Sequence, residues 1–201
     1  MPWQKFLRDL LILWATIDPI STVVIFAGLT SRLGAKQRAR VAAKAILYSS
    51  LVLVGAAVLG QFILLGMGIS IVSFQLAGGI VLFLFALQMI FGSLQNSAVE
   101  KKGEDIAVYP LAIPSIATPG AILAIIVLTD NHLHPIPTQA GTILIALAIL
   151  AFTYLLMRLA HRILSRLGRP GAELIVRVMG MILAALSVEL IIDALQSSNF
   201  L

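Results

Sequence analysis

The residues best suited to chemistry lie beside prolines inside long apolar stretches. Asp18 directly precedes Pro19, and one hundred residues later Thr118 directly precedes Pro119. Proline inside a helix removes a backbone hydrogen bond and clashes with the preceding turn, so each helix is expected to break near its proline and to restart after it. A restarted helix presents free N–H groups and the positive end of its dipole, which attract anions.

We expect a binding site for a small polar ligand where the two breaks meet. Pro114 and Gly120 are expected to contribute to the second break, and hydroxyl groups flank both breaks. The candidate substrate-binding residues are Asp18, Pro19, Ser21, Thr22, Ser115, Thr118, Pro119 and Gly120. A ligand carboxylate would lie against the two restarted helices, as in secondary transporters. The alternative is that the prolines only kink packed helices.

Two carboxylates inside apolar stretches are candidates for binding a cation or a proton. A carboxylate deep in lipid costs at least about 2.5 kcal/mol and by default marks a functional site. Asp18 could bind an ammonium group or a coupling cation, or it could only cap the restarted helix. Glu189 could carry a proton, or it could be a packed counterpart of Gln88 or an interfacial carboxylate near Asp193. The sequence leaves these alternatives open.

The elements that carry these residues are expected to be membrane-crossing helices. Hydrophobic residues make up 60% of the 201 residues, charged residues make up 11%, and the mean hydropathy is +1.03. This composition excludes an ordinary soluble domain. The apolar runs predict spans over residues 6–30, 42–65, 70–94, 108–129, 138–158 and 174–196. The expected fold class is all-α, a polytopic membrane protein with six transmembrane helices in a single membrane domain over residues 1–201.

The two halves of the sequence resemble each other. The prolines of the two breaks are 100 residues apart, and an offset one residue longer aligns the segments that begin at Gly79 and Gly180. Each half has three spans, an odd number, so the second half would enter the membrane from the opposite face. We therefore expect two inverted-topology repeats over residues 1–95 and 108–201, joined by a cytoplasmic linker over residues 96–107.

The charged residues indicate orientation and exclude several classes of site. Most of the 14 Lys and Arg residues follow the first, third and fifth spans, which places those connections in the cytoplasm and both termini outside. Such short basic connections favour contact with membrane lipid over binding of nucleic acid. The sequence contains no cysteine, which excludes thiolate-bound metals, Fe–S clusters and thiol catalysis. We expect neither a metal nor another cofactor.

Several motifs together give the sequence a family resemblance. They are Ile17-Asp18-Pro19-Ile20, the Pro-Leu-Ala-Ile-Pro segment at 110–114, Pro119-Gly120-Ala121-Ile122, and the glycine-containing segments at 78–83 and 179–184. Through them the sequence resembles the MarC family of membrane proteins from end to end. The resemblance implies six helices in two inverted repeats in a prokaryotic inner membrane. Some members resemble transporters of small neutral amino acids, and the family is distantly similar to the lysine exporter superfamily.

The sequence departs from the family pattern at three places. The first break usually reads Asp-Pro-Ile/Leu-Gly-Asn in the family, whereas Ser21 and Thr22 follow Ile20 here. Thr118 stands where a glycine is usual, and Glu189 stands where an amide is usual. A glycine would let a substrate approach the backbone more closely, so these departures predict a substrate preference that differs from the usual one of the family.

The function expected from the sequence is a secondary transporter of small neutral amino acids, for export or uptake, that works by alternating access. The carboxylate of a small zwitterionic amino acid would bind the restarted helices, its ammonium group would lie near Asp18, and Asp18 or Glu189 could couple transport to protons. The alternative is a passive channel or a regulatory membrane protein without transport of its own. An enzyme is not expected, because the sequence has no Gly-x-Ser-x-Gly elbow and no His pair within a span. The sequence does not indicate the oligomeric state.

Overall fold

The chain folds into helices. The structure, a computed structural model, describes residues 1–92, 107–131 and 133–197. The elements in chain order are α1 (Trp3–Ile17), α2 (Pro19–Leu29), α3 (Ala35–Gly66), α4 (Ile71–Phe91), the π-helix η2 (Ala107–Ile116), α5 (Pro119–Leu128) and α6 (Ile136–Ser197). The all-α class is therefore confirmed for the part of the chain that the structure describes. The predicted linker over residues 96–107 lies outside it except for its last residue.

Among the described residues, five helical stretches are long and apolar enough to cross a membrane. They are Trp3–Leu29, Ala35–Gly66, Ile71–Phe91, Ile136–Ile163 and Pro170–Ser197. The sixth predicted span, residues 108–129, corresponds to η2 and α5 in series, and α5 by itself has only ten residues. The architecture is that of a polytopic membrane protein, whereas six complete crossings and an inverted repeat stay predictions.

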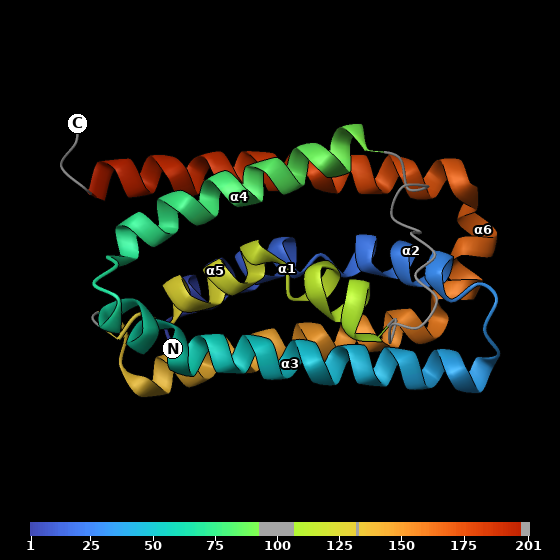
Figure 1. Cartoon of the computed structure of the whole chain (residues 1–201), viewed down its shortest axis with the longest axis horizontal. Helices are drawn as coiled ribbons and strands as arrows, with labels where there is room; N and C mark the ends of the chain where they lie inside the picture. Colours follow the sequence, from blue (N-terminus) through green and yellow to red (C-terminus); the bar gives the residue numbers. More distant parts are fainter. Residues whose placement is uncertain (93–106, 132, 198–201) are drawn as a thin grey trace.

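Helix α6 reverses direction part-way along its length. Gly168 has φ 68° and ψ 171°, which lie outside the helical region, and the positive φ is one that glycine adopts without a steric penalty. Figure 1 shows the two parts of α6 running along opposite sides of the molecule. They correspond to the predicted spans at 138–158 and 174–196.

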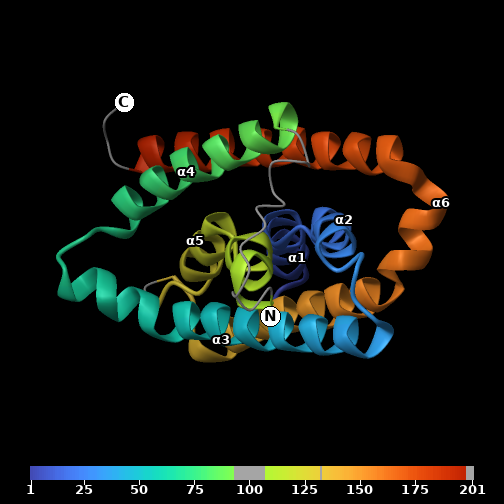
Figure 2. The ribbon, with the colours of Figure 1, turned by 45° about the vertical axis from the view of Figure 1, so that its right-hand side comes forward.

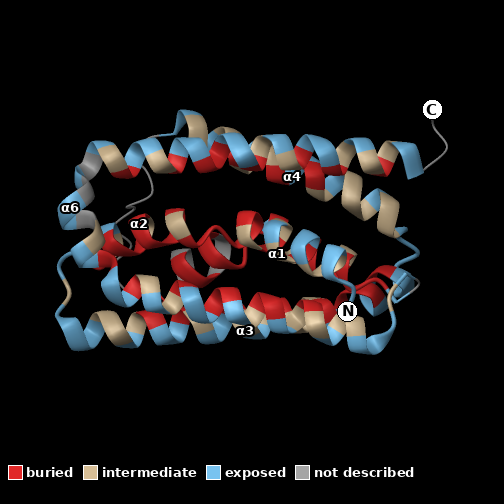
Figure 3. Ribbon diagram, turned by 180° about the vertical axis from the view of Figure 1, so that it is seen from behind, coloured by how far each residue is buried: buried red, intermediate tan, exposed pale blue. Residues whose placement is uncertain are grey.

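The interrupted helices lie in the middle of the molecule. Helices α1, α2, η2 and α5 lie between an outer layer of α3 with the first part of α6 and another of α4 with the second part of α6 (Figures 1 and 2). Figure 3 shows buried residues concentrated on the middle helices, whereas the outer layers carry long exposed stretches. Those stretches include large apolar side chains such as Leu51 and Leu84, which are 62% and 60% exposed. An apolar exterior of this kind suits a lipid environment.

Glycines allow α4 and α6 to pack closely. A Cβ atom on Gly79 would lie 2.7 Å from Cγ1 of Ile191, and one on Gly180 would lie 2.9 Å from Cβ of Met89. Small residues at such positions let helix backbones approach each other in membranes. These two glycines head the segments that the sequence analysis aligned.

The connections gather at two ends of the molecule. The start of α1, the end of α6 and the α3–α4 and α5–α6 connections lie at one end, and the α2–α3 connection and the reversal of α6 lie at the other (Figure 1). The distribution of basic residues predicted the same division of the connections between the two sides of the membrane. Which end faces the cytoplasm stays a prediction.

Candidate functional site

The first break consists of one residue, Asp18. Its backbone is left-handed, with φ 47° and ψ 70°, and its N–H donates to the Trp14 carbonyl at 3.1 Å, which ends α1. Its Oδ1 accepts from the N–H of Ser21 at 3.2 Å, which starts α2. Aspartate is among the few residues other than glycine that adopt this conformation. Pro19 occupies the first position of α2, where its missing N–H costs no hydrogen bond.

The second break repeats this capping pattern with a neutral residue. Thr118 is extended, with φ −64° and ψ 156°, and its Oγ1 accepts from the N–H of Ala121 at 2.9 Å. Pro119 occupies the first position of α5. Thr118 and Ala121 are three positions apart, as Asp18 and Ser21 are at the first break. Each of the two residues lies 100 positions after its counterpart at the first break.

The prediction that Pro114 contributes to the second break was wrong. Pro114 lies inside η2, and the chain leaves that helix only after Ile116. The N–H of Ala117 donates to the Ala112 carbonyl, five residues back, at 2.9 Å. This wider turn is that of a π-helix, which continues past the proline. π-Helices are rare and often lie at functional sites.

The structure brings the two breaks into direct contact. The hydroxyl of Thr118 donates to the Thr16 carbonyl at 2.8 Å, and the hydroxyl of Thr22 donates to the Ser115 carbonyl at 3.3 Å. Both hydrogen bonds are buried. The interruption of each helix leaves a backbone carbonyl without a partner in its own helix. A hydroxyl group from the other break donates a hydrogen bond to that carbonyl.

Three buried polar atoms at the breaks have no hydrogen-bond partner among the described residues. They are Oδ2 of Asp18, Oγ of Ser21 and Oγ of Ser115. The exposed fractions of these residues are 3%, 4% and 9%. An unsatisfied buried polar group costs about 1–3 kcal/mol, and more if it is charged. Three such atoms at the breaks call for an explanation, and a bound water, ion or polar ligand would supply the missing partners.

The two half-helices differ in the charge at their N-termini. The positive end of α2 faces the carboxylate of Asp18, whereas α5 is capped by a threonine and has no acidic residue in its first turn. The dipole of α5 therefore stays available to an anion, and the free oxygen of Asp18 stays available to a cation. Such a pair of groups can hold a ligand that carries both charges.

Of the residues that the sequence predicts for substrate binding or proton coupling, all but Glu189 lie at the two breaks. The residues buried at the breaks are Asp18, Pro19, Ser21, Thr22, Ser115, Thr118 and Gly120. Pro119 starts α5 at the second break, but it is exposed. Glu189 is exposed on α6, on a different face of the helix from the buried Ser187 and Leu190. Its role in proton coupling stays a prediction.

Cavities open at both ends of the molecule but stop short of the breaks. The terminus-side cavity, of about 340 Å³, lies among α1, α4, α5 and α6 at the end that holds the start of α1, and Leu123 is among its lining residues. The Gly168-side cavity, of about 190 Å³, lies at the opposite end, where Phe26 and Met157, each 2% exposed, line it. Asp18 lines neither of them.

An apolar seal separates the terminus-side cavity from the breaks. Ala15, Leu82 and Leu183 are buried and pack in one cluster with Leu123. A Cβ atom on Gly120 would collide with the side chain of Leu82, so this glycine lets the leucine close against the start of α5. The breaks are therefore enclosed on this side by side chains that rotamer changes could move.

Comparison with known proteins assigns a family. The model of the MarC family of integral membrane proteins matches residues 3–198. The chain belongs to the MarC family. A UPF0056 membrane protein of Methanocaldococcus jannaschii is 33% identical over 98% of this chain and 99% of its own. Another from Archaeoglobus fulgidus is 34% identical over 94% of this chain and 92% of its own. No solved structure matches the chain.

Membership of the MarC family makes this chain an integral membrane protein and confirms the resemblance seen in the sequence. The exposed apolar faces of α3, α4 and α6 suit the interior of a membrane. The two breaks lie in the buried middle of this membrane protein, where backbone and side-chain polar groups depend on protein or ligand partners.

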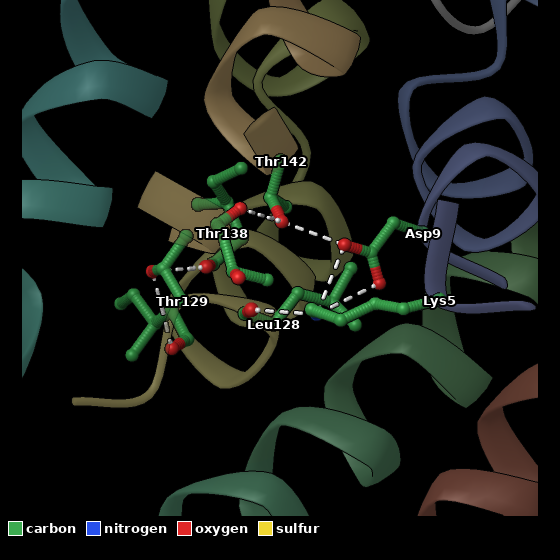
Figure 4. Close-up of polar contacts among 8 residues, drawn as sticks. Lys5, Asp9, Leu128, Thr129, Thr138 and Thr142 are labelled. Atoms are coloured by element: carbon green, nitrogen blue, oxygen red, sulfur yellow. Dashed lines mark hydrogen bonds and ion pairs between the residues drawn. The ribbon is translucent and has the colours of Figure 1, made fainter. Parts of the chain in front are cut away.

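This MarC family protein contains a partly buried ion pair that was not expected from the sequence. Nζ of Lys5 lies 3.0 Å from Oδ2 of Asp9, whose side chain is fully buried, and it donates to the Leu128 carbonyl at 3.2 Å. The hydroxyl of Thr142 donates to the same Asp9 oxygen at 2.6 Å (Figure 4). The available signal was an Asp four residues after a Lys on a helix, the spacing of an ion pair.

The far ends of both half-helices are also held by side chains. Lys5 compensates the negative end of α5 through Leu128, and Gln61 of α3 donates to the Ile126 carbonyl at 3.5 Å. At the end of α2, Nε of Arg38 donates to the carbonyls of Thr30 and Leu33 at 3.1 and 2.8 Å. The two half-helices are thus fixed at their outer ends, while unsatisfied polar groups remain where they meet.

Proposed function

We propose that this MarC family protein is a secondary transporter of small neutral amino acids and that the two helix breaks form its substrate site. The observation that carries the proposal is the group of unpartnered buried atoms, Oδ2 of Asp18 and the hydroxyls of Ser21 and Ser115. A carboxylate oxygen and two hydroxyls can accept the hydrogen bonds of an ammonium group. The N-terminus of α5 can hold the carboxylate of the same ligand.

Alternating access would expose this site to each side of the membrane in turn. The two cavities at opposite ends, neither of which Asp18 lines, support this mechanism. So does the packing of α1 and α2 against α6 and of α5 against α3 and α4, because each interrupted helix rests on the other half of the chain. Rocking of one half against the other would move the apolar seal between the terminus-side cavity and the breaks.

An inverted repeat with six crossings is part of the proposal. Equal capping geometry at two positions 100 residues apart supports a duplicated origin. In this arrangement the protein lies in the prokaryotic inner membrane with both termini outside and its basic connections in the cytoplasm. Its partners are the zwitterionic substrate and membrane lipid, and no catalytic step is assigned to it.

Counterflow in proteoliposomes tests the proposal. Vesicles loaded with unlabelled alanine should accumulate labelled alanine in a saturable manner. Asp18→Asn should lower this exchange by about tenfold or more, because it removes the charge that binds the ammonium group but keeps a residue that can cap α2. Glu173→Gln removes an exposed carboxylate from α6 and is the matched control, with exchange unchanged.

Two outcomes would overturn the proposal. Flux that rises linearly with concentration, shows no counterflow and is equal in the Asp18→Asn variant would indicate a passive channel. Failure to move glycine, alanine or a branched-chain amino acid under any imposed gradient would leave a regulatory membrane protein without transport of its own.

A further inference from the structure

Two charged residues of the terminus-side cavity have no partner among the residues that the structure describes. Arg8 of α1 and Asp193 of α6 both line the cavity. Within residues 1–92, 107–131 and 133–197, neither side chain forms a hydrogen bond or an ion pair, although Lys5 and Asp9 next to Arg8 on α1 pair with each other. The cavity thus presents an exposed guanidinium from α1 and a partly exposed carboxylate from α6.

Most of the remaining lining is apolar. Aliphatic side chains from α1, α5 and α6 form it, among them Ile12, Val127 and Leu190. The volume of about 340 Å³ is near the lower end of the range of about 300–1,000 Å³ that ligand pockets occupy. A cavity of this size with two opposite charges and mostly aliphatic walls fits a small molecule that carries a positive group, a negative group and an aliphatic side chain.

This cavity is separate from the substrate site at the breaks. Leu123 lines it, and Leu123 packs in the buried cluster with Ala15, Leu82 and Leu183 that separates it from Asp18. A ligand in the cavity would therefore lie on the route to the breaks, outside the seal. The two places differ in chemistry, because unpartnered hydroxyls lie at the breaks, whereas the lining of the cavity is mostly aliphatic, with Gln75, Gln196 and Ser197 as its uncharged polar members.

We propose that the terminus-side cavity is a second substrate site that binds a zwitterionic amino acid with an aliphatic side chain. Arg8 holds the ligand's carboxylate, because guanidinium and carboxylate form paired, charge-assisted hydrogen bonds. Asp193 holds the ammonium group, and the aliphatic walls cover the side chain. The inference rests on the proposed transport of neutral amino acids. It adds a binding site outside the seal, where the protein would select amino acids with aliphatic side chains before they reach the breaks.

The number of ligands bound per chain tests this inference. Binding of labelled leucine to the full chain in lipid nanodiscs should saturate at two per chain. Arg8→Gln and Asp193→Asn should each weaken one of the two sites by about tenfold or more, and Asp18→Asn should remove the other. Arg40→Gln, at an exposed arginine of α3, is the matched control and should leave both sites intact.

Competition with ligand analogues tests the same inference independently. Glycine should compete only at the site that Asp18 forms, whereas leucinamide, which lacks the carboxylate, should lose affinity for the site that Arg8 forms. The double variant Arg8→Asp with Asp193→Arg should regain part of the lost binding, because it keeps both charges in the cavity. This recovery also shows that loss in the single variants does not come from misfolding.

The outcomes separate this inference from the proposed function. Counterflow with one leucine per chain, removed by Asp18→Asn and unaffected by Arg8→Gln, would overturn the second site and leave the transporter intact. Absence of both binding and flux would overturn both. A phospholipid that copurifies with the wild type and is lost in Arg8→Gln, with leucine binding unchanged, would assign the cavity to a lipid and overturn the inference.

Discussion

The two carboxylate oxygens of Asp18 have different environments. Oδ1 caps α2 through the N–H of Ser21, and Oδ2 is buried without a partner among the described residues. The sequence left capping and ligand binding as alternatives for this residue. The geometry accommodates both, since capping occupies one oxygen and leaves the other. A buried charge of this kind is costly by itself, which is why a ligand cation is the partner we propose.

The ion pair of Lys5 and Asp9 predicts a large effect on stability. Lys5→Met leaves the fully buried carboxylate of Asp9 with Thr142 as its remaining partner, and we expect a loss of about 3–5 kcal/mol in the free energy of unfolding. Thermal unfolding in detergent measures it. Lys5→Met combined with Asp9→Leu should recover most of the loss, because no unpaired charge remains and Thr142 can still donate to the Thr138 carbonyl. A double variant as unstable as the single one would contradict the ion-pair explanation.

Glu189 provides a test of proton coupling that is independent of substrate binding. The residue is exposed on α6 and apart from the breaks, so Glu189→Gln should leave counterflow exchange of alanine unchanged. If Glu189 carries the coupled proton, the variant should lose accumulation driven by an imposed pH gradient. Transport into vesicles with and without that gradient measures this. Accumulation equal to that of the wild type would exclude Glu189 as the proton carrier.

Among the elements, the α4–α6 pair depends on close backbone approach. A Cβ atom on Gly180 would lie 2.9 Å from Cβ of Met89 and 3.1 Å from the Ala86 carbonyl oxygen. Neither atom is at the end of a flexible side chain, so the helices would have to separate. We expect Gly180→Ala to lower the free energy of unfolding by about 1–3 kcal/mol, as overpacking usually does.

Gly55 of α3 is the matched control for this substitution. A Cβ atom there would meet nothing within 4 Å. Gly55→Ala should therefore raise stability by up to about 1 kcal/mol, since alanine favours a helix over glycine. The same thermal unfolding measurement compares the two variants. Equal changes in stability in the two variants would mean that close packing between α4 and α6 is not the reason for a glycine at position 180.

For the whole molecule, the middle position of the interrupted helices follows from their polar groups. Free backbone groups cannot face lipid, so helices with breaks must be surrounded by other helices. The unbroken apolar helices α3 and α4 and the two parts of α6 provide that surrounding, and their outer faces expose apolar side chains (Figure 3). The same enclosure creates the two cavities that stop short of the breaks.

Orientation in the membrane can be tested directly, because the chain has no native cysteine. Met67 lies between α3 and α4, Ser31 lies between α2 and α3, and both are exposed. A membrane-impermeant maleimide should label Met67→Cys in intact spheroplasts and should label Ser31→Cys only after permeabilisation. The reverse pattern would place both termini in the cytoplasm and contradict the predicted orientation.

The sequence alone was sufficient for features that depend on local chemistry. Pro19 and Pro119 begin new helices because proline lacks an N–H and has a fixed φ, and these properties do not depend on the rest of the fold. The apolar runs likewise predict the membrane helices, because the bilayer sets the length and hydropathy that a crossing requires. The breaks, their capping residues and most of the candidate site could therefore be derived from short segments.

Only the tertiary structure decided which polar groups are satisfied. Pro114 remains within a helix because the chain widens into a π-helix around it, and Asp9 is buried because Lys5, Leu128 and Thr142 surround it. Likewise, the hydroxyls of Thr22 and Thr118 donate hydrogen bonds, whereas those of Ser21 and Ser115 have no partner in the described part of the chain. A hydrogen bond depends on where a partner about a hundred residues away lies, and no local pattern contains that information. The sequence therefore locates the breaks, and the packing of the helices determines which of their atoms can bind a ligand.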